Sequence, residues 1–292
     1  MRITNSILYR AIKRNVQKSS ENVYKYQEQI ASGKRINRPS DDPLGAMKAQ
    51  QLHTSLNKID QFSRNHTYAK TWLNASEAAL SQSSDLLVRL KEITLAQGSS
   101  NSNENTREIA AEEVRTLKDQ LLSLANTKVS NRSIFAGHQT GSTTFAGDGT
   151  YGGDDGNIYL NIKEGIALKV NHTGEEIFKS DTYKNIFETV NELVTALENN
   201  DGETIREKID EIDTTFQNVN RNISFIGSLH NQVENVREMS EEEKIRHKEH
   251  LGEVEEIDLV EAVIGLESAR NTYQTALSGA KTISQMNLSQ LL

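Results

Sequence analysis

Two heptad patterns, one at each end of the chain, constrain its fold more than any other feature. Near the N-terminus, apolar or small residues recur at alternating steps of four and three, at Ile12, Val16, Ser19, Val23, Tyr26 and Ile30. The C-terminal region has the matching series Leu259, Ala262, Leu266, Ala269, Tyr273, Ala276, Ala280 and Ile283. This spacing places the residues on one helix face, as in a coiled coil. Both ends are therefore predicted to be long helices with narrow apolar seams.

The middle of the chain carries three more series of this kind. They are Leu73, Ser76, Leu80, Ser83, Leu87 and Leu90; Ala110, Val114, Leu117, Leu121 and Leu124; and Ile205, Ile209, Ile212, Phe216, Val219, Ile223, Ile226, His230 and Val233. Only 35% of the residues are hydrophobic and 5% aromatic, which is lean for one globular core. We therefore predict a mainly α fold, an elongated rod of long helices in a coiled coil or bundle, with the middle series as internal core.

Both prolines of the chain, Pro39 and Pro43, fall within residues 32–43. Because glycine ends helices and proline interrupts them, this segment is predicted to be a loop between two helices. Asp42 is placed to cap the next helix, with Pro43 at its first position. A second break is predicted at the polar residues 99–105, where Asn105 would cap the following helix.

Helical periodicity stops near Ile134 and gives way to alternation. The alternating residues are Ile158, Leu160 and Ile162, then Ile166, Leu168 and Val170, with Lys163-Glu164-Gly165 between them. This pattern predicts a β-hairpin with a three-residue connection. The sequence thus predicts three domains: 1–42 with 256–292 as a terminal coiled-coil assembly domain, 43–133 with 182–255 as a helical rod domain, and 134–181 as a small β-containing domain.

Composition and motifs argue against several classes of function. The chain has no cysteine, which excludes disulfides and thiolate sites. Its net charge of -8 disfavours general nucleic-acid binding. No segment has the 18 apolar residues of a membrane span, so no membrane insertion is expected. Residues 1–15 lack the apolar block of a signal peptide, so the chain is expected in the cytoplasm unless a dedicated export route carries it.

Candidate metal and catalytic groups are few. His247 and His250 lie near Glu243, but they lack the spacing of a zinc peptidase, and a solvated helix face is preferred. Three aspartates among glycines, Asp148, Asp154 and Asp155, lack the spacing of a calcium loop and are interpreted as turns. No set of nucleophile, base and orienting group is found. We predict no enzyme activity, no metal and no cofactor.

The terminal helices are predicted to need partners. Their seams are narrow and contain several alanines, so they bury little apolar surface against the entropy lost on ordering. We therefore expect these ends to order fully only against neighbouring subunits. The predicted assembly interface comprises Ile12, Val16, Val23, Tyr26, Ile30, Leu259, Ala262, Leu266, Ala269, Tyr273, Leu277 and Ile283.

Several segments resemble one known family. Residues 26–36, Tyr-Gln-Glu-Gln-Ile-Ala-Ser-Gly-Lys-Arg-Ile, followed by Pro39-Ser40-Asp41-Asp42-Pro43, are similar to the N-terminal signature of flagellins and their junction relatives. Residues 258–262, 273–277 and 131–137 are similar to other segments of that family. The signature loop comprises Gly33, Ile36, Pro39, Asp41, Asp42 and Pro43. The opening residues 1–4 and the ending 286–292 resemble the junction branch more than filament flagellin.

The resemblance implies a flagellin-like structural subunit at the junction between hook and filament. It implies hook-associated protein 1 and flagellin as partners, other copies in a ring, and an export chaperone. It also implies type III export to the extracellular flagellum without a cleaved signal. The alternatives are filament flagellin itself and, from another class, a cytoplasmic coiled-coil signalling module of chemoreceptor type. A hydrolase with calcium at the glycine-rich turn is a third and weaker alternative.

Overall fold

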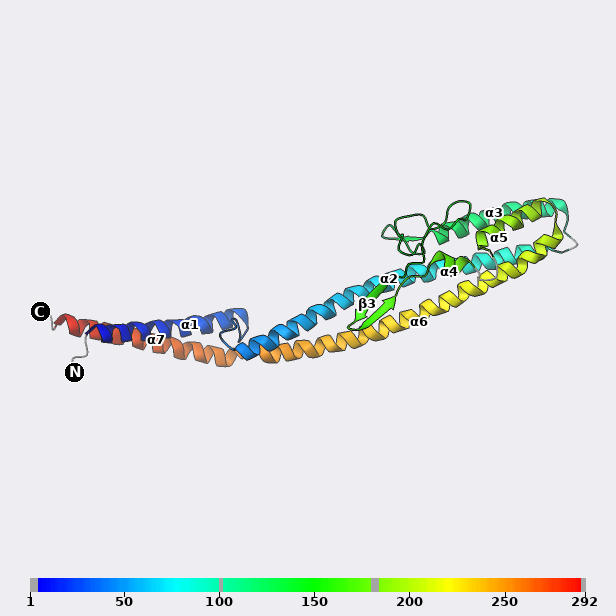
Figure 1. Ribbon diagram of the computed structural model, residues 1–292. Coiled ribbons are helices and arrows are strands. Elements are labelled where there is room, and N and C mark those ends of the chain that lie inside the picture. The colour runs from blue at the N-terminus through cyan, green and yellow to red at the C-terminus, as the bar shows by residue number, and fades with distance from the viewer. Residues whose placement is uncertain (1–4, 100–101, 180–183, 290–292) are drawn as a thin grey trace. The chain divides into compact units, whose positions relative to one another are not determined.

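The computed structural model describes residues 5–99, 102–179 and 184–289, without the side chains of residues 5, 6, 8 and 283–289. Its helices are α1 (Asn5–Ser32), α2 (Pro43–Gln97), α3 (Glu104–Ala125), α4 (Gly174–Phe178), α5 (Ile186–Glu198), α6 (Gly202–Glu255) and α7 (Leu259–Ser289). Its strands are β1 (Lys128–Val129), β2 (Arg132–Ser133), β3 (Tyr159–Lys163) and β4 (Ile166–Lys169). The prediction of a mainly α fold with long helices and a small β region is confirmed (Figure 1).

Two compact units divide the chain. Unit 1 comprises Met1–Lys58 and Glu242–Leu292, and unit 2 comprises Ile59–Glu241. Unit 1 therefore also includes residues 43–58 and 242–255, which the sequence assigned to the rod domain. The three-domain division stays a prediction.

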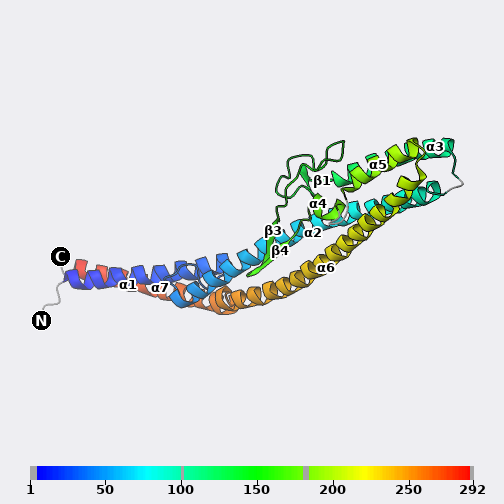
Figure 2. The same ribbon diagram turned by 45° about the vertical axis from the view of Figure 1, so that its right-hand side comes forward.

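In unit 1, α1 and α7 lie side by side, and this is visible in both views (Figures 1 and 2). The helices are antiparallel, because Tyr26 near the end of α1 packs against Gly265 near the start of α7. Farther along, Asn15 and Ala276 line one shared groove. The two ends of the chain thus form one helix pair.

The core of unit 2 follows the predicted seams. Every residue of the α2 series is buried, including the polar Ser76 and Ser83, whose hydroxyls donate to the carbonyls of Trp72 and Ala79. The α6 residues Ile205, Ile212, Val219, Ile226 and Val233 are buried in the same cluster. α3 contributes Val114, Leu117 and Leu121. The α2 series is therefore internal core throughout, as predicted. In the α3 and α6 series most residues are buried, and the half-buried ones are Leu124, Ile209, Phe216, Ile223 and His230.

The predicted hairpin is confirmed, with one correction. β3 pairs antiparallel with β4, with Leu160 opposite Leu168. The connection has two residues rather than three, because Lys163 itself pairs with Ile166. Gly165 takes a φ of +77°, the left-handed conformation that the tight turn needs. The hairpin is held on α2 by His66, whose ring Nε2 lies 2.7 Å from the Ile162 carbonyl oxygen.

An aromatic cluster in unit 2 was not predicted. Phe145 packs against Phe187 of α5, with ring centroids 4.9 Å apart and ring planes tilted by 54°. It also meets Phe178 of α4 edge-on at 5.7 Å. The chain between α3 and β3 carries no regular periodicity, so only the structure shows that it folds back over α5.

The predicted cap of α3 was wrong by two residues. The cap is Asn103, whose side chain accepts the Thr106 amide at 2.9 Å, while the Thr106 hydroxyl accepts the Asn103 amide at 3.2 Å. This reciprocal pair fixes the first turn before Asn105 is reached. In the part of the chain that the structure describes, no helix is long and apolar enough to cross a bilayer.

Candidate assembly site

The predicted interface residues lie mostly along the line where α1 and α7 meet. Ala262 is buried, at 3% exposure, while Leu259 and Leu277 are exposed at 56% and 43%. The side chain of Ile283 lies outside the described residues. The others are half-buried, namely Ile12, Val16, Val23, Tyr26, Ile30, Leu266, Ala269 and Tyr273. The seam thus closes the chain's own helix pair, and its role between subunits stays a prediction.

An exposed apolar patch at the start of α7 was missed by the heptad pattern. We call it the α7 patch: Leu259, Val260, Val263 and Ile264, exposed at 56%, 70%, 54% and 66%. Its last three members lie between the seam positions, so the seam leaves them outside. The spacing of four between Val260 and Ile264 is the sequence signal that could have shown this second face. Exposed apolar clusters of this kind mark sites of protein contact.

The signature loop is an ordered connection. Gly33 ends α1 with a φ of +69°, the left-handed geometry that favours glycine. Ile36 is buried, and a Cβ on Gly45 would lie only 2.5 Å from its Cδ1 atom. The loop therefore needs glycine at position 45, a requirement that the sequence pattern did not reveal. Pro39 is exposed.

Two aspartates fix the end of this loop. Asp41 accepts the Arg38 amide at 3.0 Å and lies 3.6 Å from the Lys25 ammonium. Asp42 accepts the Gly45 amide at 2.9 Å, which confirms it as the cap of α2 ahead of Pro43. This amide, together with the nearby Arg35 guanidinium, lowers the pKa of Asp42.

Glu255, the last residue of α6, joins the loop to the segment before α7. Its carboxylate lies 2.8 Å from the Lys34 ammonium and 3.0 Å from His53 Nε2. Its carbonyl accepts the Arg35 amide at 2.6 Å, and the Ile257 amide donates to the Gly33 carbonyl at 3.2 Å. These contacts bind the signature loop to the α6–α7 connection. The two are short extended segments that pair with each other.

The Glu255 contact is expected to depend on pH. Partial burial opposes its ionisation, but the hydrogen bonds from Lys34 and His53 outweigh it, so the pKa of Glu255 is lowered. A lowered pKa means that the pairing stabilises the fold above the unfolded value of about 4.3 and is lost as the pH falls through the folded pKa. Glu255→Gln is therefore expected to speed hydrogen exchange of the Arg35 and Ile257 amides at pH 7, relative to the unchanged chain. The difference between the two proteins should disappear as the pH falls through the folded pKa of Glu255.

The exposed Glu253 supplies the matched control for this prediction. It is on the same helix, and its ion pair in the described part of the chain is with His250, at 3.1 Å. Glu253→Gln should leave both amides unchanged. Equal exchange in all three proteins at pH 7 would show that Glu255 does not hold the loop.

The polar clusters singled out in the sequence serve local structure. Among the described residues, no group of three or more His, Asp or Glu is placed to hold a metal ion. His247 lies 3.6 Å from Glu243 on one helix face. Asp148 accepts the Thr150 amide at 2.9 Å, and Asp154 accepts the Gly156 amide at 3.0 Å, so both aspartates shape turns.

Comparison with known proteins agrees with this architecture. Residues 3–140 match the family described as the bacterial flagellin N-terminal helical region. The chain is 26% identical to flagellar hook-associated protein 3 of Escherichia coli, over 88% of this chain and 89% of that protein. It is 28% identical to the Salmonella typhimurium protein of the same name, over 68% and 67%. The crystal structure of Xanthomonas campestris FlgL shares the fold, with a TM-score of 0.64, 17% identity, and coverage of 69% and 99%.

Paired terminal helices, a signature loop and these similarities define a flagellin-like protein, a structural component of the bacterial flagellum. The chain is similar to the flagellin family over residues 3–140 and, along most of its length, to flagellar hook-associated protein 3. The relatives are structural proteins, and the comparisons do not favour filament flagellin or a signalling module.

Proposed function

We propose that this chain joins the flagellar hook to the filament, and that its terminal helices fold fully as they assemble. Hook-associated protein 1 is the proposed partner on the hook side and flagellin on the filament side, with copies of this chain forming a ring between them. Similarity to hook-associated protein 3 along most of the chain supports this role.

One observation carries the proposal of coupled folding. In α1 and α7, Gln29 and Ala262 are the only buried side chains among those described. α2, by contrast, fully buries Trp72 and Leu73 within unit 2. A helix pair with so thin a core is only marginally stable by itself. Contact of its exposed faces with neighbouring copies would supply the missing burial.

The proposed route to the flagellum rests on the resemblance to flagellins, and the marginal helix pairing is compatible with it. The chain is exported through the flagellar type III apparatus, with a cytoplasmic chaperone covering it beforehand. Helices that gain little from pairing within one chain open at low cost for passage through a narrow channel. On arrival they order against neighbours, as in other coupled folding and binding.

Deletion combined with labelling tests the proposed function. Cells without the chain are expected to keep hooks and lose attached filaments. A labelled chain that restores motility should appear as a short band at the outer end of the hook. Label along the whole filament would identify the chain as flagellin instead, and intact filaments in the deletion strain would reject a junction role.

A further inference from the structure

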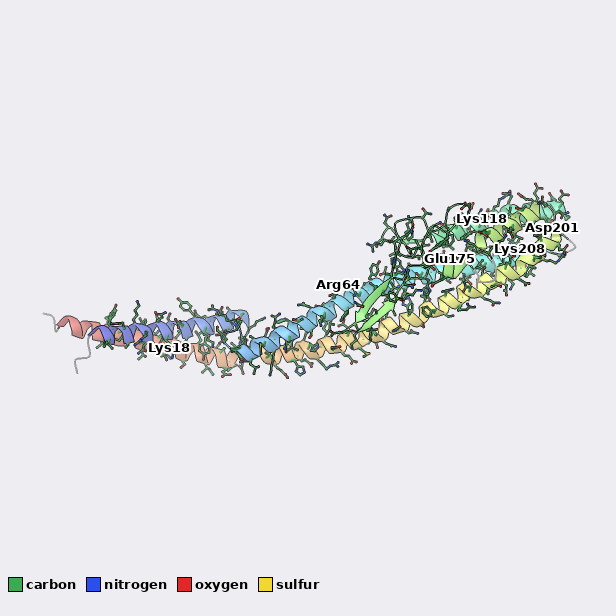
Figure 3. The ribbon with its side chains drawn as sticks, viewed as in Figure 1. Lys18, Arg64, Lys118, Glu175, Asp201 and Lys208 are labelled. Atoms are coloured by element: carbon green, nitrogen blue, oxygen red, sulfur yellow. The ribbon has the colours of Figure 1, made fainter. Side chains whose placement is uncertain are left out.

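The first half of α1 carries an excess of positive charge. Between residues 5 and 20 the chain has Arg10, Lys13, Arg14 and Lys18, and no aspartate or glutamate, although its net charge is -8. The side chains of Lys13, Arg14 and Lys18 are exposed and have no ion pair among the described residues. Figure 3 labels Lys18 on the α1–α7 pair. We call these three residues the α1 basic face.

Elsewhere in α1 and in the loop that follows it, basic side chains pair with acidic ones. The α1 basic face differs in this respect. Lys25 lies 3.6 Å from Asp41, and Arg38 lies 3.2 Å from Glu28. On α7, Glu267 lines the same groove as Lys18, but its ion pair among the described residues is with Arg270, at 3.8 Å. Beyond it, Lys281 is the only charged residue between positions 271 and 289. Arg14 and Lys18 are one turn apart on α1 and both are exposed, with Lys18 at the edge of the groove between the two helices. The α1 basic face is therefore available to a partner outside the helix pair.

A complementary acidic face lies on the first turns of α6 in unit 2. It comprises Glu203, Glu207 and Asp210, all exposed and without an ion pair among the described residues. Their spacing of four and three places them on one side of the helix. Glu203 suits the N-terminal helix dipole, but Glu207 and Asp210 lie beyond the first turn, so the dipole does not account for them. We call these residues the α6 acidic face.

We propose that the α1 basic face of one copy binds the α6 acidic face of a neighbouring copy. This inference rests on the proposed function, which brings copies together in a ring. Both faces cover two helical turns and carry three charges of opposite sign. A contact between two different faces is heterologous, so it can repeat around a ring. Charge pairs of this kind set register and partner choice more than affinity.

Paired charge reversals test the contact in cells. The variants are Arg14→Glu with Lys18→Glu on the basic face, and Glu207→Lys with Asp210→Lys on the acidic face. Each pair alone is expected to reduce the fraction of cells with attached filaments about ten-fold. All four changes in one chain should restore most attachment, because the attraction is rebuilt with exchanged signs. A basic-face defect that the acidic variant neither reproduces nor rescues would overturn the pairing and assign this face to another flagellar protein.

Crosslinking provides an independent readout, because the chain has no cysteine. A Lys18→Cys chain and a size-tagged Glu207→Cys chain would be expressed together, and the isolated flagella treated with a short bismaleimide. We expect a crosslinked pair of tagged and untagged chains. Gln27→Cys, exposed on α1 about 14 Å along the helix from Lys18, should give none with the tagged chain.

These outcomes separate the contact from the junction role. If the labelled, unchanged protein gives no band at the hook, the proposed function itself is rejected. If the band is present, an absent 18–207 crosslink together with wild-type filaments in both reversal variants would reject the contact alone.

Discussion

Replacing Arg107 by methionine is expected to lower the free energy of unfolding of unit 2 by about 3 kcal/mol, from the cost of unsatisfied buried groups. Arg107 is only 7% exposed. Its guanidinium donates to the Gln97 carbonyl at 3.1 Å, the Ser99 carbonyl at 3.3 Å and the Asn200 carbonyl at 3.0 Å. One side chain thus caps the C-terminal ends of both α2 and α5. Methionine fills similar space but leaves the Gln97 and Asn200 carbonyls without this donor, while the Ser99 carbonyl keeps the Ser102 amide at 3.3 Å.

Urea denaturation of the full chain, followed by circular dichroism, measures this change. Arg115 is the matched control, because it lies two turns farther along the same helix. It is exposed and pairs with Glu112 and Glu198. Arg115→Met should cost under about 1 kcal/mol, as is usual for surface ion pairs. Equal losses in the two variants would mean that Arg107 is no more than another surface charge.

Arg107 also shows which part of the fold the sequence could not reveal. Heptad spacing identified the helices and the buried faces of α2, α3 and α6, because apolar period follows directly from helix geometry. A polar residue that binds three separate chain segments adds no periodic pattern to the sequence. Its partners, such as Ser99 and Asn200, lie far apart in the sequence. The same holds for Glu255, whose contacts with Lys34 and His53 depend on tertiary structure.

The candidate site was predictable to a similar degree. The proline and glycine positions, with the Asp42 cap, located the signature loop. The seam residues of α1 and α7 were found from their spacing, but a period defines a helix face without naming what covers it. In the structure, the seam face of α1 is partly covered by α7, and the seam face of α7 is partly covered by α1. The Val260–Ile264 spacing and the basic residues of α1 are visible in the sequence, but only the pairing of α1 with α7 shows that both faces stay exposed.

Ala262→Glu is expected to abolish filament attachment while leaving unit 2 unchanged. Ala262 is 3% exposed in the seam between α1 and α7. The cations that line the same groove, Lys25 and Arg35, already pair with Asp41 and Asp42. A carboxylate at position 262 would therefore have to leave water or break one of these pairs, at a cost of several kcal/mol, or the helices would have to separate. The core of unit 2 does not include this residue. The urea midpoint of unit 2 should therefore match that of the unchanged chain, while cells carry bare hooks.

Gln274→Glu adds the same charge to α7 at an exposed position and should preserve attachment. Val263→Glu changes the α7 patch without entering the seam, so it tests the open face separately and is expected to lose attachment as well.

Mild proteolysis then decides when the terminal helices fold. If order comes with assembly, the ends of the isolated chain are cut equally fast with and without Ala262→Glu, and the unchanged chain is protected only in flagella. Protected ends in the isolated unchanged chain would mean that α1 and α7 are already stable as a pair, and that assembly joins finished units.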